Sequence, residues 1–406
     1  MASHVRACLC GGALILLFAR PGAAGTLQID LPAALARARD RAPDAIASRA
    51  RAGEVRALRA GATAWMSQNP RLEVGAGPRS GPDRTLVIQG QLSVPIELST
   101  RRVQLAVADA QLAHANATTE AELREVGLAV TTAFYEARFA DLAIELAVRN
   151  QDVATRAAEA AARRRKAGDL TDLEVNLATI ALGRARAAVA SERANRAEAI
   201  GRLGLLIAAG PDDALELVGD LSPLPVTLDT LRAAVGTRPD LRAIDAEASE
   251  ARAESAVAAV TGRPDVTTWV SYERDEGDTI LLGGLSFTLP VWNRNVAARA
   301  AARAKLARTG LERSSRTAAA SRQVGDAFEG YTRAREAVEI FTRDVLPALA
   351  DSEQLLERSI ETGQLPINVY LVARQEILAG RREHLERRLQ LAKAAAAARF
   401  AAGVAP

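Results

Sequence analysis

Two segments of the chain alternate apolar and polar residues with a period of two, the pattern of strands that have one apolar face. The apolar faces hold Leu86, Ile88 and Leu92 in the first segment and Phe287, Leu289 and Val291 in the second. A weaker alternation precedes each segment, so two hairpins are expected, over about 70–98 and about 264–292. The pattern fits a transmembrane β-barrel or a soluble half-buried sheet. Four strands cannot close a barrel, whose smallest forms have about 8.

Helical periodicity dominates the rest of the chain. A moderate helix is expected over Leu31–Met66, broken near Pro43, and another over Thr227–Val260, broken near Pro239. After each strand pair comes a stretch of 71 residues, Leu98–Gly168 and Asn293–Gly363, and then a second long helix. Pro347 is the one proline in these two stretches and could bend the second. Rods of roughly 100 Å predict a tube or a coiled-coil spacer.

The two halves of the chain repeat the same order of elements. Gly168-Asp169-Leu170-Thr171 corresponds to Gly363-Gln364-Leu365-Pro366, and other matched positions keep nearly the same offset. We expect a first repeat over 25–219, with its helical hairpin turning at 167–171, and a second over 220–406, turning at 362–366. Residues 1–24 are typical of a secretory signal peptide.

Composition narrows the class of protein. The 52 basic and 49 acidic side chains nearly balance, which argues against a nucleic-acid-binding protein. Both cysteines, Cys8 and Cys10, lie in the expected signal, so no disulfide is predicted. Beyond the signal, His114 and His384 stand alone on their helices, and no catalytic or phosphate-binding motif occurs. We therefore predict no enzyme activity, no cofactor and no metal site.

Two motifs at the strand-to-helix junctions resemble a known family. They are Gln91-Leu-Ser-Val-Pro-Ile-Glu-Leu98, followed by Arg101-Arg102, and Gly284-Leu-Ser-Phe-Thr-Leu-Pro-Val-Trp-Asn-Arg-Asn295. With the repeated order of elements, they resemble the TolC-type outer-membrane efflux ducts, and within these the branch serving cobalt, zinc and cadmium exporters. That branch usually has two glycines and a lysine where Ser99-Thr100 stand here.

The resemblance implies a mainly α fold: a long α-helical coiled-coil barrel plus four transmembrane strands per chain. A homotrimer would complete a 12-stranded barrel in the outer membrane, with the strand residues given above facing lipid. The helices would form a second barrel across the periplasm. An inner-membrane proton-driven pump of the RND type and a periplasmic adaptor would be the partners, with no nucleic acid.

The turns of the long hairpins are the candidate sites. Gly168 suits a left-handed helix cap, Thr171 and Glu174 have capping-box spacing, and Pro366 suits a first helical turn. By resemblance these turns form the periplasmic tip that contacts the adaptor: Gly168, Asp169, Leu170, Thr171, Gly363, Gln364, Leu365 and Pro366. The family often has acidic residues after the second turn, where they line the closed entrance, but Val369 and Val372 stand at these positions here. By this resemblance the candidates for an entrance constriction are Glu174, at the equivalent position of the first half, and the apolar group Val369, Tyr370 and Val372. Ordinary helix packing is the alternative.

The sequence thus predicts the passive exit duct of a tripartite efflux system, conducting heavy-metal cations. Two alternatives remain open at this point: a duct for organic compounds or drugs, and a periplasmic coiled-coil scaffold that conducts nothing. The outward-facing residues of the strands separate these readings, because they would contact lipid only in a duct.

Overall fold

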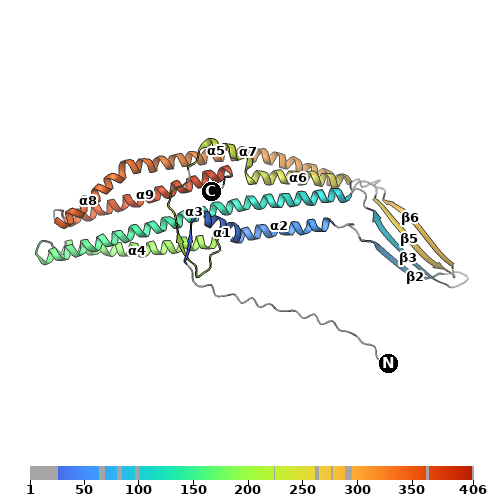
Figure 1. Cartoon of the computed structure of the whole chain (residues 1–406), viewed down its shortest axis with the longest axis horizontal. Coiled ribbons are helices and arrows are strands. Elements are labelled where there is room, and N and C mark those ends of the chain that lie inside the picture. Colours follow the sequence, from blue (N-terminus) through green and yellow to red (C-terminus); the bar gives the residue numbers. More distant parts are fainter. Residues whose placement is uncertain are drawn as a thin grey trace, which may run out of the picture.

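The computed structural model describes residues 26–63, 69–79, 85–96, 100–223, 225–260, 265–275, 278–288, 295–362 and 365–404. Helices run along a long axis, and a small sheet lies at one end (Figure 1). The expected signal peptide, Leu289, Val291, Gly363 and Gln364 lie outside the described residues.

The order of the elements follows the sequence pattern. The first half contains β1 (Thr26–Ile29), α1 (Leu31–Arg41), α2 (Pro43–Ala62), β2 (Arg71–Arg79), β3 (Thr85–Ile96), α3 (Thr100–Lys166), α4 (Asp172–Leu206) and β4 (Ala214–Leu217). The second contains α5 (Leu228–Ala234), the short 3₁₀ helix η1 (Val235–Thr237), α6 (Pro239–Val260), β5 (Asp265–Asp275), β6 (Asp278–Thr288), α7 (Val296–Ile340), the π-helical turn η2 (Phe341–Val345), α8 (Leu346–Thr362) and α9 (Ile367–Ala402). The expected breaks near Pro43 and Pro239 are confirmed, since both prolines begin a new helix.

The four longer strands form one antiparallel sheet in the order β2-β3-β5-β6. Its register places Leu92 opposite Leu72 on one side and opposite Val270 on the other. Hairpins therefore come from neighbouring segments, and the β3–β5 pairing joins the two halves of the chain. In the second hairpin, β5 and β6 pair as far as Asp275 and Asp278.

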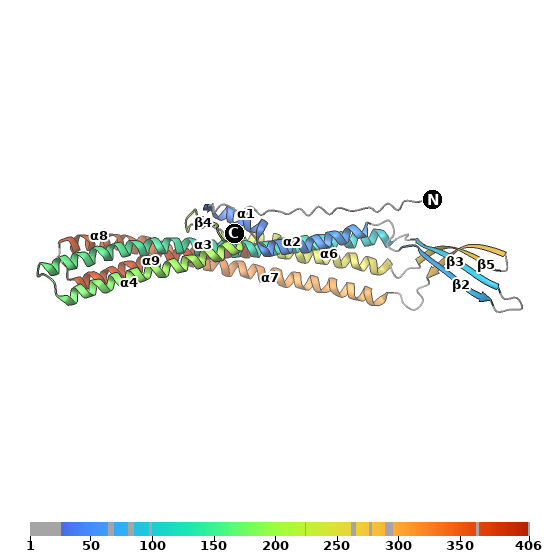
Figure 2. The same ribbon diagram turned by 90° about the horizontal axis from the view of Figure 1, so that it is seen from below.

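Helices α2, α3, α6 and α7 lie side by side between the sheet and the middle of the molecule (Figure 1). At the far end, the α3–α4 hairpin packs against the α8–α9 hairpin (Figures 1 and 2). α3 belongs both to the row of helices beside the sheet and to the first hairpin, because it is helical over 67 residues without a proline.

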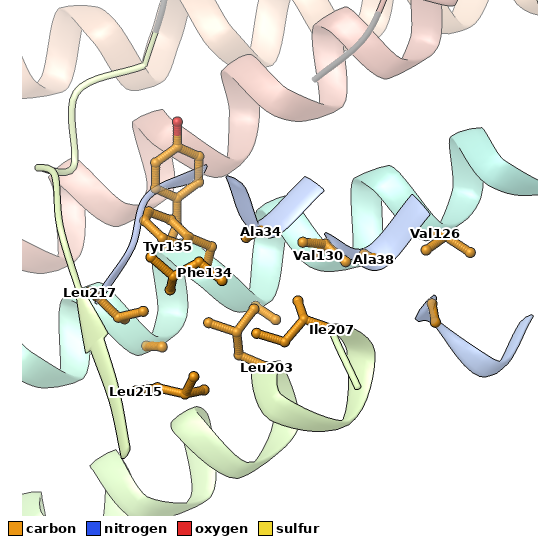
Figure 3. Packing of buried hydrophobic residues seen from close by; sticks show 14 of the residues in the cluster. Ala34, Ala38, Val126, Val130, Phe134, Tyr135, Leu203, Ile207, Leu215 and Leu217 are labelled. Atoms are coloured by element: carbon orange, nitrogen blue, oxygen red, sulfur yellow. The ribbon is translucent and has the colours of Figure 1, made fainter. Parts of the chain in front are cut away.

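A large hydrophobic cluster lies in the middle of the molecule, where the row of α2, α3, α6 and α7 meets the two helical hairpins. There Phe134 and Tyr135 of α3, in an edge-to-face arrangement with ring centroids 6.1 Å apart, pack with Leu203 and Ile207 of α4 (Figure 3). Short strands β1 and β4 pair in parallel beside this cluster, so Thr26–Ile29 is joined to a segment 188 residues further along the chain. Sequence analysis missed this pair, because each strand has only four residues.

A buried arginine joins the second half to the same region. Arg238 is 6% exposed and donates to both carboxylate oxygens of Asp240, at 2.9 and 2.8 Å. It also donates to the carbonyl oxygen of Ala401 at 2.6 Å, near the end of α9. Gly403 has a φ of +82°, and a Cβ there would lie 2.6 Å from the Arg238 side chain. A glycine is therefore required where α9 ends against this arginine.

The long helical stretch of the second half, formed by α7, η2 and α8, is bent, as the position of Pro347 predicts (Figure 1). Pro347 has no N–H to donate to the carbonyl of Arg343, and its ring would clash with that carbonyl in a regular helix. The chain widens into the π-turn just before it, where the Leu346 N–H donates to the carbonyl of Phe341, five residues earlier.

Removing Leu203 should destabilise the molecule strongly. Leu203 is fully buried on α4, whereas Leu205, two residues along the same helix, is 77% exposed. We expect Leu203→Ala to lower the free energy of unfolding by about 2–5 kcal/mol, because it leaves a cavity in the core. Chemical denaturation of the purified protein measures this, and Leu205→Ala, the matched control, should change it by about 0.5 kcal/mol at most. Equal effects of the two substitutions would contradict the packing described here.

Candidate functional site

The first hairpin turn connects α3 to α4 and is fixed by its own backbone. Gly168 adopts a φ of +91°, and its N–H donates to Arg165 O while the Asp169 N–H donates to Arg164 O, at 3.0 and 2.9 Å. These bonds satisfy carbonyls that the end of α3 would otherwise leave open. The left-handed cap predicted at Gly168 is confirmed.

The start of α4 is held by the predicted capping box. The Thr171 N–H donates to a carboxylate oxygen of Glu174 at 2.9 Å, and the Glu174 N–H donates to the Thr171 hydroxyl. The bond from the Thr171 N–H lowers the pKa of the Glu174 carboxyl. Glu174 is thus committed to the turn. Glu174, one of the candidates for the entrance constriction, therefore has a structural task in this chain.

Four consecutive basic residues, Arg163–Lys166, end α3 beside this turn. Arg165 donates to both carboxylate oxygens of Asp172, at 2.7 and 3.1 Å, and this contact lowers the pKa of Asp172. Basic side chains at a helix C-terminus are favoured by the helix dipole. The tip of the first hairpin therefore combines a capped turn with basic side chains, two of which, Arg163 and Arg165, pair with carboxylates.

The second hairpin turn differs in its construction. Leu365 is half-buried, and Pro366 is the N-cap of α9 without a side-chain cap bond. The carbonyl of Pro366 accepts from the Tyr370 N–H at 3.1 Å, which begins the helix. No capping box like that of Thr171 and Glu174 holds this start.

An apolar cluster brings the two turns together. Leu170, next to the first turn, packs with Ile367 and Tyr370 after the second, all at most 7% exposed. The two hairpins therefore end at the same end of the molecule, where Figure 2 shows the ends of α4 and α9 close together. Tyr370, a candidate for the constriction, belongs to this packing, and burial raises the pKa of its hydroxyl.

Two valines just after the second turn are exposed. Val369 and Val372 have exposed fractions of 46% and 68%, in contrast with 4% for Tyr370 between them. Positions three apart lie on the same face of a helix, so α9 presents an apolar patch beside the tip. Of the constriction candidates, these two are free to contact another chain or a solute.

Ion pairs join α9 to α4 and to α8 on the side of the tip that faces the middle of the molecule. Arg382 of α9 donates to Glu192 of α4 at 2.5 Å, and Glu353 of α8 accepts from Arg374 and Arg381 at 2.8 and 3.1 Å. Burial raises the pKa of Glu353, but the two arginines outweigh burial, and the net shift is downward. Sequence reasoning missed these pairs, because their residues lie on different helices and are separated by 21, 28 and 190 positions in the chain, beyond any local spacing.

The sheet at the opposite end has one apolar face. Strand pairing aligns Leu72, Leu92 and Val270 across three strands, and Ile96, Val266 and Phe287 align in the same way on the same face. The other face carries Glu73, Gln91 and Ser271 in register. Leu86, Ile88, Leu92 and Phe287 are 41–63% exposed. The structure thus brings together all the described strand residues that the alternation assigned to one face.

Metal-binding groups are scattered through the part of the chain that the structure describes. Within it, no three His, Cys, Asp or Glu side chains gather as a metal site would need. His114 bonds Glu250 at 2.7 Å, and His384 lies on α9. Among the same residues, no helix combines the length and the apolar character that a membrane crossing requires.

Comparison with known proteins gives relatives in sequence and in fold. The chain is 31% identical to Protein CyaE of Bordetella pertussis over 185 residues, 44% of this chain and 39% of that protein. It is 26% identical to the cobalt-zinc-cadmium resistance protein CzcC of Cupriavidus metallidurans over 210 residues, half of each chain. The chain thus matches at most about half the length of these curated relatives. No family model matches it.

Solved structures match over nearly the whole chain. CusC aligns with a TM-score of 0.73 and 15% identity, covering 93% of this chain and 94% of that one. The outer membrane protein VceC of Vibrio cholerae aligns with a TM-score of 0.72 and 18% identity, covering 92% and 96%. This chain therefore has the TolC-like fold of outer-membrane channels, and the predicted fold class is confirmed.

Replacing Glu353 should loosen the α8–α9 hairpin in a pH-dependent way. Because the pKa of Glu353 is lowered in the folded protein, its stabilisation is present above the ordinary carboxyl pKa, near 4.3, and disappears as the pH falls below it. We expect Glu353→Gln to lower stability by about 1 kcal/mol at pH 7 and to have a smaller effect at pH 3.5. Thermal unfolding at both pH values measures this. Glu386→Gln, on the exposed side of the same hairpin, should have little effect at either pH.

Proposed function

We propose that this chain, which has the TolC-like fold, is the outer-membrane exit duct of a tripartite efflux system. One observation carries the proposal: a four-stranded sheet with a continuous apolar face lies at the end of helices several times longer than the sheet. A half-buried sheet in a soluble protein packs its apolar face against other elements. Here Leu72, Leu86 and Leu281 of that face remain 63–69% exposed, which favours contact with lipid.

The duct must contain more than one copy of the chain. Strands β2 and β6 are the edges of the sheet and have no further partner within the described chain. Open strand edges are not tolerated in a bilayer, so neighbouring copies would pair with them. We propose a homotrimer, whose twelve strands would close the sheet and whose helices would surround a periplasmic passage.

The tip of the hairpins is the proposed contact for a periplasmic adaptor, which would link the duct to an inner-membrane RND-type pump. The first turn supports this role, because its cap and ion pair hold Gly168, Asp169 and Thr171 in a fixed shape before any partner binds. Leu365 and Pro366 lie at the same end. Val369 and Val372 are the proposed residues of an apolar entrance constriction, in which each copy would supply one patch.

Heavy-metal cations are the proposed substrates. The support is the likeness to the cobalt-zinc-cadmium resistance protein over half of the chain, together with the junction motifs. The proposed duct does no chemistry, and selection of the metal would belong to the pump. Organic compounds remain the alternative substrate class, and a non-conducting periplasmic scaffold is the alternative for the whole assembly.

A charge on the apolar face of the sheet should prevent membrane insertion. Arg at a lipid-facing position costs about 2–4 kcal/mol near the middle of a bilayer. We expect Leu92→Arg to reduce the amount of protein in outer-membrane fractions several-fold, as measured by blotting. The matched control is Gln91→Arg, one residue away on the polar face, which should leave that amount nearly unchanged. Equal recovery of both variants would favour the scaffold.

Loss of the gene should make the cell sensitive to what the duct exports. We expect the deletion strain to grow less well on graded zinc, cobalt and cadmium, with growth restored by the wild-type chain. A panel of dyes and detergents is the parallel arm. Sensitivity to organic compounds alone would keep the duct and exclude metals as its substrates. A protein found in the periplasm, with no sensitivity of either kind, would contradict the duct itself.

A further inference from the structure

We propose that the π-turn Phe341–Val345 is a hinge in the helical wall, and that the protonation state of His384 controls it. With a neutral His384 the turn is held against α9, and protonation releases it. The inference concerns the internal mechanics of the chain and goes beyond the proposed export function. Nothing in it depends on which solute is carried.

The turn is a weak point that one half of the chain has and the other lacks. α3 runs over 67 residues as a regular helix, whereas its counterpart in the second half is divided into α7, the turn and α8. Pro347 withholds one backbone donor, and a π-turn interrupts the regular α-helical hydrogen bonds at a place where helices kink. Bending about this turn therefore breaks fewer good hydrogen bonds than bending elsewhere in α7 or α8.

Side chains from α9 clasp the first residue of the turn. Phe341 is 7% exposed, and the His384 ring stacks on it with centroids 5.8 Å apart and an angle of 21° between the planes. Arg387, one helical turn further along α9, places its guanidinium carbon 5.3 Å from the centre of the same ring. We call this group of three side chains the Phe341 clasp. It joins the turn to α9 through side chains.

The surroundings of His384 suit a neutral ring. Its Nδ1 is buried and has no hydrogen-bond partner among the described residues. A neutral imidazole can leave that nitrogen as a weak acceptor, but a protonated one would bury an N–H donor without an acceptor, at the cost of its lost hydration. Burial, and then the charges of Arg388 and Arg381, lower the pKa of His384.

Among the described residues, the charges that shift the pKa of His384 belong to arginines, and no carboxylate contributes. Most carboxylates on α9 and on the elements packed around it already pair with arginines: Glu339 with Arg335, Asp344 with Arg343, Glu353 with Arg374 and Arg381, Glu192 with Arg382, Glu145 with Arg149, Asp141 with Arg138 and Arg196, Glu383 with Arg387, Glu386 with Arg382, and Asp220 with Arg388. Glu336, Asp351 and Glu376 lie on the same helices but are not among the charges that act on His384. A charged imidazole would be attracted to the Phe341 ring. The Arg387 guanidinium carbon already lies 5.3 Å from the centre of that ring, and burial together with Arg388 and Arg381 disfavours a charge on His384, so this attraction does not offset the loss of hydration.

The direction of the pH effect follows from these contacts. Because the folded chain lowers the pKa of His384, the clasp contributes fully above the ordinary value of about 6.5. Its contribution declines as the pH falls from that value to the lower pKa of the folded state. Each unit of difference between the two values corresponds to a tenfold change in the opening equilibrium.

Amide hydrogen exchange of the full chain in detergent tests the proposal. Exchange is followed in peptides covering residues 338–348 at pH 7.5 and pH 5.0, after correction for the intrinsic pH dependence of exchange. We expect the turn to be less protected than the flanking parts of α7 and α8, and to lose protection at pH 5.0 by about tenfold per unit of pKa difference.

Three variants separate the hinge from general acid loosening. His384→Phe keeps an aromatic ring against Phe341 but cannot be protonated, so the turn should be equally protected at both pH values. His114→Gln removes the other histidine beyond the signal region and should keep the wild-type response. Pro347→Ala restores a backbone donor and should raise the protection of the turn.

A full pH response in His384→Phe, or none in the wild-type chain, would overturn the role of His384. Protection at the turn equal to that of α7 and α8 at both pH values would overturn the hinge. The measurement requires no transport, adaptor or metal. Failure here would leave the proposed duct untouched, and failure of the duct would leave this result standing.

Discussion

The row of α2, α3, α6 and α7 is one helix thick, and this constraint shapes much of the rest of the molecule. Within the described residues, each helix of the row packs mainly against the next one, so it buries chiefly the stripes that face its neighbours. Close approach then matters more than bulk, and the buried residues along these helices include Ala52, Ala108, Ala251 and Ala302. Small side chains let the helices approach closely, but they contribute little burial per residue.

Charged side chains supplement this thin packing by joining helices across the row. Lys305 of α7 donates to Glu250 and Glu254 of α6 at 2.9–3.1 Å, and Glu250 also bonds His114 of α3. Burial raises the pKa of Glu250, but the bonds to His114 and Lys305 lower it on balance. Such a chain of contacts fixes the lateral order of three helices. Exposed single ion pairs, such as that of Arg333 with Glu329, contribute much less to the stability of the fold.

Features that repeat over many residues, or that depend on local spacing, could be predicted from the sequence. The strand faces followed from the alternation around Leu92, and the length of α3 followed from the absence of proline. The Gly168 cap and the Thr171 capping box followed from local spacing. Contacts between distant segments could not be predicted. β1 and β4 are too short to give a pattern, Glu192 and Arg382 are 190 residues apart, and the burial of Tyr370 between two exposed valines depends on Leu170 from the other hairpin.

The two hairpins meet at one tip but differ in stiffness, and the difference has a physical origin in single residues. In the first, Thr171 and Glu174 cap α4, and α3 is regular throughout its length. In the second, α9 starts at Pro366 without a side-chain cap, and Pro347 forces a π-turn into the preceding helix. Leu170 and Tyr370 join the hairpins at the tip, so a movement of the second must change the packing against the first. A rigid hairpin in contact with an adjustable one lets the tip change shape while one turn keeps a fixed surface.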